Sequence, residues 1–173
     1  MRLSPRRQRT RLPAGVEREP GVQLGRAVRF TVAPGARVVL ERGCRIGDGS
    51  RFEVAAGEVR VGAGVRLGER CVVSACERIE IGAGVHAGDD VLLTDTTRAI
   101  ADVERPLRLQ GLLSAPVVIG EGAKLGARSC VLPGVTVGAR AVLEAGSVAE
   151  NDVPARVIAA GVPARRYSAA PSS

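Results

Sequence analysis

Residues 117–165 read VVIGEGAKLGARSCVLPGVTVGARAVLEAGSVAENDVPARVIAAGVPAR, and an aliphatic side chain recurs there at every sixth position. These anchor positions are Ile119, Leu125, Val131, Val137 and Leu143. A period of six fits neither an α-helix nor a flat sheet, but it fits a short strand plus a tight turn, repeated along a solenoid. The stretch therefore predicts an all-β coil with one inward aliphatic side chain per strand.

A second register supports the same interpretation. Small or β-branched residues stand four positions after each anchor, at Ala123, Ser129, Val135, Ala141 and Ser147. Because alternate residues of a strand point to the same face, these side chains should lie inward beside the next anchor. Glycines such as Gly120 and Gly126 follow the anchors, and glycine favours the tight corners that a solenoid needs.

The pattern also appears upstream. Its anchors there are Val61, Leu67, Val73, Ile81, Ala87 and Leu93. The step from Val73 to Ile81 is eight residues, which predicts an enlarged corner near residues 75–77. Weaker echoes at Leu40, Ile46 and Phe52 predict an imperfect opening turn of the same coil.

These patterns divide the chain of 173 residues into one domain and two tails. We expect a basic, disordered N-terminal tail over residues 1–24, the β-helix over residues 25–167 and a flexible C-terminal tail over residues 168–173. The aromatic content of 2% suits a narrow prism filled by Val, Leu, Ile and Ala. No apolar run approaches 18 residues, so no membrane span is expected. The N-terminus lacks the apolar part of a secretory signal, which predicts a cytoplasmic protein.

The four cysteines follow neither metal nor redox spacing, so we expect no metal site and no disulfide scaffold. Cys44 and Cys71 occupy the small inward position and should be buried as small hydrophobic residues. Cys76 and Cys130 should be free thiols.

The net charge of +7 raises the possibility of a nucleic-acid-binding protein. Much of the excess lies in the first residues, at Arg2, Arg6, Arg7, Arg9 and Arg11. Aromatic side chains that could stack on bases are confined to Phe30, Phe52 and Tyr167. We therefore favour a solvated basic tail and no nucleic-acid partner. The arginines of the coil could instead attract an anionic ligand such as a nucleotide phosphate.

The six-residue pattern stops after Leu93 and resumes at Val117, so residues 94–116 should form one long excursion loop. A long loop on a rigid repeat scaffold is where function usually lies.

Motifs around and after this loop resemble those of a known family. They are Pro106, Gln110-Gly111, residues 116–120 (PVVIG), 132–135 (LPGV), 144–148 (EAGSV), 152–154 (DVP) and 161–165 (GVPAR). Over roughly residues 59–166 the chain resembles the left-handed parallel β-helix acyltransferases. This hexapeptide-repeat family includes maltose and galactoside acetyltransferases and the O-acetyltransferases of bacterial surface polysaccharides. The resemblance implies left-handed coiling, whereas the general rule for crossovers would predict the opposite hand.

The resemblance implies acetyl-CoA bound in a groove between adjacent subunits of a homotrimer. In the family, a loop histidine takes the proton of an acceptor hydroxyl, which is a poor nucleophile until a base near neutral pKa removes that proton. The matching stretch here is Asp-Thr-Thr-Arg at residues 95–98, so both family histidines are absent and Thr96 stands at the catalytic position. Asp95 and His86 are the substitute bases that the chain offers.

His86 is the only histidine in the chain. Strand alternation turns it outward, and six-residue counting places it between Arg66 and Lys124 on successive coils, about 4.8 Å apart. A solvated or subunit-interface histidine is the alternative to a relocated base.

On the cofactor side, the resemblance implies a groove lined by Ala127, Ala145 and Arg165, with Arg165 able to pair with a phosphate. Lys124 replaces a tryptophan that is frequent in the family. Glu150-Asn151 replaces a Thr-Lys pair, so Asn151 stands where a lysine lies close to the CoA phosphates. For the two alanines, simple packing in tight turns is the alternative.

Two functions follow from these residues. The first is an acyl-CoA-dependent O-acyltransferase that moves an acetyl group to a hydroxyl of a sugar or small molecule, slowly because the loop histidine is missing. The second is a catalytically inactive trimeric scaffold or regulatory subunit, since a fold does not by itself fix a function.

Overall fold

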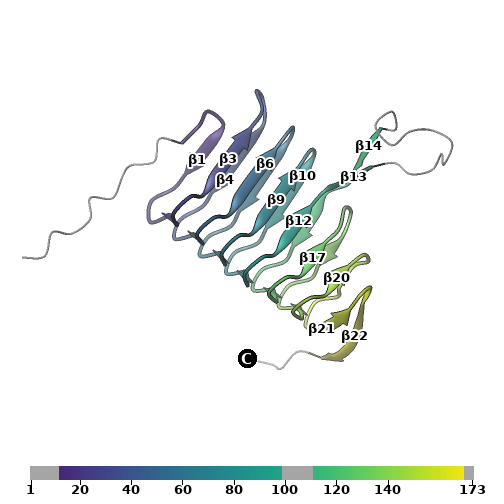
Figure 1. Ribbon diagram of the computed structural model, residues 1–173. Helices are drawn as coiled ribbons and strands as arrows, with labels where there is room; N and C mark the ends of the chain where they lie inside the picture. Colours follow the sequence, from purple (N-terminus) through teal and green to yellow (C-terminus); the bar gives the residue numbers. More distant parts are fainter. Residues whose placement is uncertain (1–11, 99–110, 170–173) are drawn as a thin grey trace, which may run out of the picture.

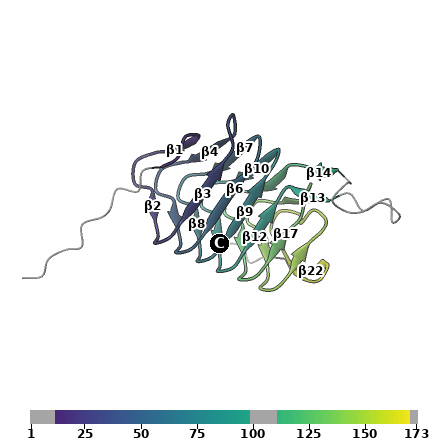
Figure 2. The same ribbon diagram turned by 45° about the horizontal axis from the view of Figure 1, so that its top comes forward.

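The computed structural model describes residues 12–98 and 111–169. Within them the chain winds as a left-handed parallel β-helix, in which each turn contributes one strand to each of three parallel sheets, A, B and C (Figures 1 and 2). The predicted fold class, an all-β hexapeptide-repeat solenoid with one long excursion, is confirmed. The described residues contain no helix, and hence none that is long and apolar enough to cross a membrane.

The strands are short, and their order along each sheet follows the turns of the coil. Sheet A contains β1 (Val16–Arg18), β4 (Arg37–Leu40), β7 (Glu58–Val61), β10 (Arg78–Ile81), β15 (Val117–Ile119) and β18 (Thr136–Val137). Sheet B contains β2 (Gln23–Leu24), β5 (Arg45–Ile46), β8 (Arg66–Leu67), β11 (His86–Ala87), β16 (Lys124–Leu125), β19 (Val142–Leu143), β21 (Val157–Gly161) and β22 (Ala164–Ala169). Sheet C contains β3 (Arg29–Val32), β6 (Arg51–Val54), β9 (Val72–Ala75), β12 (Leu92–Thr94), β17 (Cys130–Val131) and β20 (Val148–Ala149).

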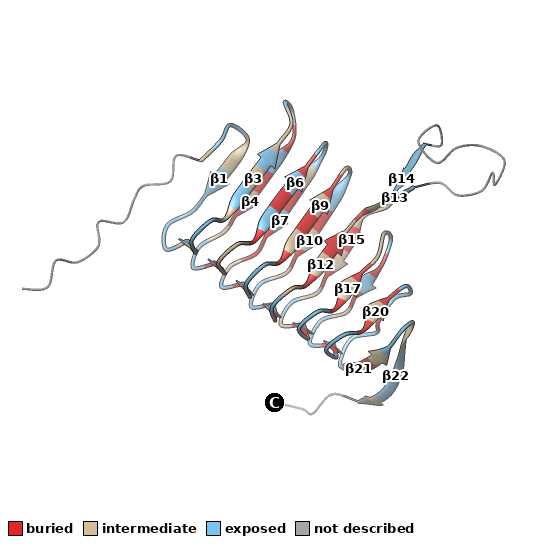
Figure 3. Cartoon of the chain, in the orientation of Figure 1, coloured by how far each residue is buried: buried red, intermediate tan, exposed pale blue. Residues whose placement is uncertain are grey.

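The core is a single column of aliphatic side chains inside the prism. Figure 3 marks the buried residues in red along the successive turns. All predicted anchors from Leu40 to Leu143 are buried, and so are the small residues Ala123, Ser129, Val135, Ala141 and Ser147. Near the N-terminal end Phe30 stacks on Phe52 with ring centroids 4.9 Å apart, so the wider first turns are filled by two aromatic rings.

Two cysteines belong to this core. Cys44 and Cys71 are buried as predicted, and burial raises the pKa of both thiols. Cys76 and Cys130 are free thiols, as the sequence predicts, and are partly exposed. The two inner cysteines therefore act as small hydrophobic residues.

Tight corners join the sheets, and they explain the glycines that follow the anchors. A Cβ on Gly126 would lie 2.3 Å from the backbone nitrogen of Ala145 in the next turn, closer than two such atoms can approach. We name the corners by the sheets they join. The A–B corner contains residues 120–122, the B–C corner contains residues 126–128, and their equivalents in other turns follow the same naming.

The C–A corner is the variable one. The eight-residue step from Val73 to Ile81 crosses it, with a turn at residues 76–77 between β9 and β10. Both strands are four residues long and keep regular parallel pairing with their neighbours, so the extra residues lengthen the strands, rather than enlarge the corner, without breaking the coil. The excursion over residues 94–116 leaves from this same corner. Its described part is an antiparallel ribbon of β13 (Thr96–Arg98) and β14 (Leu112–Ser114), which projects from the prism (Figure 1).

The structure corrects both predicted domain boundaries. The coil begins before residue 25, because β1 and β2 pair in regular register with β4 and β5. At the other end β22 folds back on β21 as an antiparallel hairpin that extends to Ala169, beyond the expected limit at residue 167. The first turn has a neighbour on one side only, so its Val16, Val22 and Leu24 are half-buried rather than buried.

Candidate functional site

Asp95 lies at the base of the excursion, at the C–A corner between β12 and β13. Its side chain is buried, and its two oxygens accept four hydrogen bonds. Oδ1 accepts from the backbone N–H of Cys76 at 2.8 Å and from Thr96 Oγ1 at 2.7 Å. Oδ2 accepts from the N–H groups of Glu77 at 2.7 Å and Arg78 at 2.8 Å.

These bonds define what Asp95 does in the fold. A carboxylate offers about four lone-pair positions, and all of them are occupied here. The three N–H donors belong to the two residues of the corner in the preceding turn and to Arg78, which begins β10. Asp95 is therefore the cap of that corner, and the arrangement leaves no oxygen open to an acceptor substrate.

Other polar side chains surround this cap. Thr96, at the position of the family histidine, is half-buried and donates to Asp95. It lies opposite Ser114 in the ribbon, and Ser114 Oγ donates to Glu77 Oε2 at 3.1 Å. Glu77 is exposed, so it offers an accessible carboxylate at the base of the loop. Sequence reasoning missed Glu77 and Ser114, because no motif marks either residue. Pro106 and Gln110 lie outside the described residues.

His86 lies elsewhere, on the outer face of sheet B. It is exposed, and it pairs in register with Arg66 on one side and Lys124 on the other, which confirms the predicted stacking. Asp95 is at the C–A corner, so the two candidate bases do not converge within one subunit.

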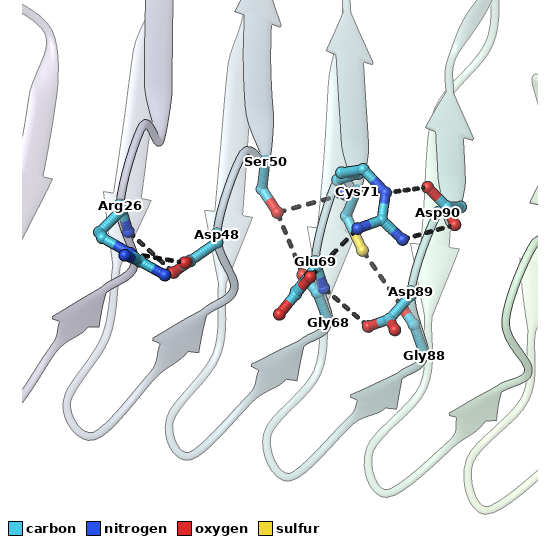
Figure 4. Close-up of polar contacts among 10 residues, drawn as sticks. Arg26, Asp48, Ser50, Gly68, Glu69, Cys71, Gly88, Asp89 and Asp90 are labelled. Atoms are coloured by element: carbon cyan, nitrogen blue, oxygen red, sulfur yellow. Dashed lines mark hydrogen bonds and ion pairs between the residues drawn. The ribbon is translucent and has the colours of Figure 1, made fainter.

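The B–C corner changes character along the coil. In the N-terminal turns carboxylates bond to it (Figure 4). Asp48 Oδ1 accepts the N–H of Arg26 at 2.8 Å, and Asp89 Oδ1 accepts the N–H of Glu69 at 2.8 Å. The bond from Arg26 holds the pKa of the Asp48 carboxyl below its ordinary value. Beside them Arg70 donates two bonds to Asp90, at 2.8 and 3.0 Å, and lowers the pKa of that carboxyl.

Alanine replaces aspartate at this corner in the later turns. Ala127 and Ala145 follow Asp89 in the same column, since Ala127 abuts Gly88 and Ala145 abuts Gly126. Both alanines are exposed, and their N–H groups have no partner among residues 12–98 and 111–169. The result is a bare edge with small side chains and two free backbone donors.

Arg165 lies beside this edge. It is exposed on β22 and pairs with Ala160 of β21, the strand that follows β19 in sheet B. The strand pairing therefore places Arg165 on the side of sheet B that leads into the corner of Ala127 and Ala145. Lys124 is three residues before Ala127, on the outer face of β16, and it is exposed as well.

Asn151 is not part of that edge. It lies at the C–A corner of the last turn, next to Asp152, whose Oδ1 accepts the N–H of Thr136 at 2.7 Å. The candidate residues thus fall into two sets at different corners of the prism, with Ala127, Ala145 and Arg165 at one and Asp95, Thr96 and Asn151 at the other. Across the described part of the chain, no three His, Cys, Asp or Glu side chains gather in a way that could hold a metal ion.

Known proteins match both the C-terminal turns alone and most of the chain. Residues 116–148, which carry the bare corner, match the family model described as the hexapeptide repeat of succinyl-transferase. A protein of Mycobacterium tuberculosis described as a probable acetyltransferase is 32% identical over 145 residues, covering 83% of this chain. The chain spans 48% of the length of that relative.

Two solved structures share the fold. AntD, an N-acyltransferase of Bacillus cereus solved with dTDP-4-amino-4,6-dideoxyglucose and coenzyme A, superposes with a TM-score of 0.77 at 16% identity, covering 91% of this chain and 83% of its own. A hexapeptide-repeat-containing acetyltransferase of Vibrio cholerae, solved with acetyl coenzyme A, gives a TM-score of 0.63 at 25% identity, covering 73% of this chain and 71% of its own. With its six-residue repeat, its three-sheet coil and these relatives, the chain belongs to the hexapeptide-repeat, left-handed parallel β-helix acyltransferase family.

Proposed function

We propose that the protein is an acyl-CoA-dependent acyltransferase whose site is shared between two subunits of a homotrimer. The observation that carries the proposal is the bare B–C corner at Ala127 and Ala145. Its two free N–H groups suit the amide oxygens of the pantetheine arm of CoA, and its small side chains let that arm approach the backbone. Carboxylates accept the N–H groups of Arg26 and Glu69 at the same corner in the earlier turns, whereas no carboxylate stands in this column after Asp89.

The phosphates of CoA need cations, and Lys124 and Arg165 lie near the corner. Arg165 is on β22 and Lys124 is on the outer face of β16, so both belong to sheet B next to this corner. An arginine suits a phosphate because its planar fork donates two parallel hydrogen bonds. Glu150 and Asn151 replace a cationic element of the family, so we expect weak binding of CoA.

Sheet C offers the contact face for a trimer. Its outward residues in four successive turns are apolar and half-buried, and they stack in register: Val72, Leu92, Cys130 and Val148. An apolar stripe on an otherwise charged prism is suited to an interface between subunits. If sheet C faces a three-fold axis, the B–C corner lies next to one neighbouring subunit and the C–A corner lies next to the other.

That arrangement would join the two sets of candidate residues. The B–C corner of one subunit, with Ala127 and Ala145, would meet the C–A corner of the next, with the excursion loop and Asn151. The acyl donor would then be held by one subunit and the acceptor by the loop of its neighbour. A monomer would have half of each site.

The reaction breaks the thioester C–S bond and forms a bond from the acyl carbon to the acceptor, while the proton of the attacking group passes to the leaving thiolate. A hydroxyl acceptor needs a base, and Asp95 is fully occupied. His86 could act only from a neighbouring subunit. Transfer to a sugar hydroxyl should therefore be slower by about 10²–10⁴ than with a positioned base.

An amine is the second candidate acceptor, and the occupied Asp95 favours it. A neutral amine attacks a thioester without prior removal of a proton, so it depends less on a base than a hydroxyl does. Glu77 could accept a hydrogen bond from the neutral amine at the base of the loop. The fold also serves amine acceptors elsewhere, as the N-acyltransferase AntD illustrates.

Release of free CoA thiol from acetyl-CoA, measured with matched hydroxyl and amino sugars, tests the function. We expect faster release with the amino sugar. Thr96→His would place an imidazole beside the Asp95 carboxylate and should raise transfer to the hydroxyl sugar while leaving the amine rate nearly unchanged. CoA binding without any thiol release would identify the inactive scaffold instead. An acyl-CoA donor also fits the expected cytoplasmic location, where this cosubstrate is made.

A further inference from the structure

The outer face of sheet B carries a ladder of four basic residues along the axis of the coil. Arg45 pairs in register with Arg66, Arg66 with His86, and His86 with Lys124. All four side chains are exposed, one per turn. Neighbouring strands lie about 4.8 Å apart, so the ladder is a single file about 14 Å long.

This ladder is not compensated by acidic residues. None of the four side chains makes a hydrogen bond or ion pair with any described residue. The nearby acids at the B–C corner are engaged elsewhere, because Asp48 pairs with Arg26 and Glu69 with Arg70. At the same corner Asp89 accepts the N–H of Glu69.

Sheet A shows what a compensated ladder looks like in the same molecule. Arg37 lies 3.0 Å from Glu17 and 3.7 Å from Glu58, and Arg60 lies 3.2 Å from Glu58. Opposite charges across strands stabilise a sheet, whereas like charges directly opposite one another destabilise it. Sheet B therefore keeps an arrangement that costs stability, which a bound anion would offset.

We propose that the ladder of Arg45, Arg66, His86 and Lys124 binds a linear acidic polysaccharide that runs along the outer face of sheet B. A single file of basic side chains suits one extended chain that carries a carboxylate on every sugar. Arg45, Arg66 and His86 lie outside the proposed CoA corner. The inference therefore holds whether or not the protein transfers an acyl group.

Two other linear anions fit less well. Single-stranded nucleic acid is usually held by aromatic side chains on which bases stack, and β2, β5, β8, β11 and β16 carry none. An extended acidic peptide presents same-face carboxylates about 6.6 Å apart, which does not match the rungs of the ladder.

Binding of an oligogalacturonate to the full-length protein, measured at low ionic strength, tests the proposal. We expect saturable binding that weakens with added salt, because exposed charges are screened. Arg45→Gln/Arg66→Gln should reduce the affinity roughly tenfold, as expected for the loss of two exposed ion pairs. The same double variant should unfold at an equal or higher temperature, since it removes repulsion between opposed arginines.

Arg140→Gln/Arg156→Gln is the matched control, because these arginines are also exposed and lie in successive turns, at the A–B corner and away from sheet C. This control removes two positive charges, as the ladder variant does, and should leave the affinity for the oligogalacturonate unchanged. Equal loss in both variants would show a general charge effect and overturn the proposal. So would no binding at low salt, binding of uncharged dextran with equal affinity, or tighter binding of single-stranded DNA than of the oligogalacturonate.

Discussion

The carboxylate of Asp95 accepts the backbone N–H of Glu77, in the corner of the preceding turn, at 2.7 Å. This bond, with those from Cys76, Arg78 and Thr96, ties the base of the excursion to the coil. A residue that the sequence suggests as a base is thus engaged in holding the loop in place. The consequences can be measured separately for stability and for catalysis.

Asp95→Asn should destabilise the fold by about 2–4 kcal/mol. Asparagine replaces one carboxylate oxygen by an NH₂ group, which donates hydrogen bonds and cannot accept them. The groups that now donate to that oxygen would lose their acceptor and stay unpaired in a buried place. Urea unfolding measures the loss. Asp152→Asn, which affects one exposed bond from Thr136, should cost less than 1 kcal/mol. Unchanged stability together with lost acyl transfer would identify Asp95 as a base instead.

Ser129→Ala should leave stability unchanged or raise it by up to about 1 kcal/mol. The hydroxyl of Ser129 is buried and has no partner among the described residues, so its removal restores apolar packing. Ser147 is the matched control in the same column, because its Oγ accepts the N–H of Gly161 at 3.1 Å. Ser147→Ala should lower the free energy of unfolding by about 1 kcal/mol. Equal effects of the two variants would contradict this account of the core.

The phenol of Tyr167 should titrate above its ordinary pKa of 10.0, because its O–H donates to the Glu144 carboxylate. Since the folded pKa is raised, the bond stabilises the fold fully below pH 10 and is lost as the pH rises through the folded pKa. Tyr167 is the only tyrosine of the chain, so its phenolate absorbance reports this residue alone. Glu144→Gln should move the pKa of Tyr167 back toward 10.0. If the variant leaves this pKa unchanged, the hydrogen bond between Tyr167 and Glu144 is absent in solution.

Leu92→Arg should convert the trimer to monomers. The change places a charge in the middle of the apolar stripe on sheet C, while the outward position of Leu92 leaves the core intact. Light scattering should give about three chains of 17.9 kDa for the natural sequence and one for the variant. Thr136→Arg, outward on sheet A, is the control and should stay trimeric. A natural protein that is monomeric at micromolar concentration would refute the shared site.

The repeat made most of the fold predictable. Six-residue counting placed every anchor from Leu40 to Leu143 and the neighbours of His86, because each turn repeats the geometry of the last. The first turn was missed because Arg18 stands at an anchor position, where the pattern expects an aliphatic residue.

The site was less predictable than the fold. The role of Asp95 depends on hydrogen bonds to a corner about twenty residues earlier, which no local pattern encodes. The bare edge at Ala127 and Ala145, in contrast, had an available signal. Counting along the B–C corner gives Arg26, Asp48, Glu69, Asp89, Ala127 and Ala145, so the loss of carboxylates can be read from the sequence.

The central claim is that the bare B–C corner holds CoA, and Ala145→Asp tests it most directly. An aspartate there should cap the N–H of Ala127 as Asp89 caps that of Glu69, so the fold should be as stable as before or slightly more stable. The same carboxylate would remove a donor from the edge and repel the CoA phosphates. Calorimetry should show that CoA binds the natural protein and binds Ala145→Asp at least tenfold more weakly. Equal affinity of the two proteins would contradict the account and place the cofactor elsewhere.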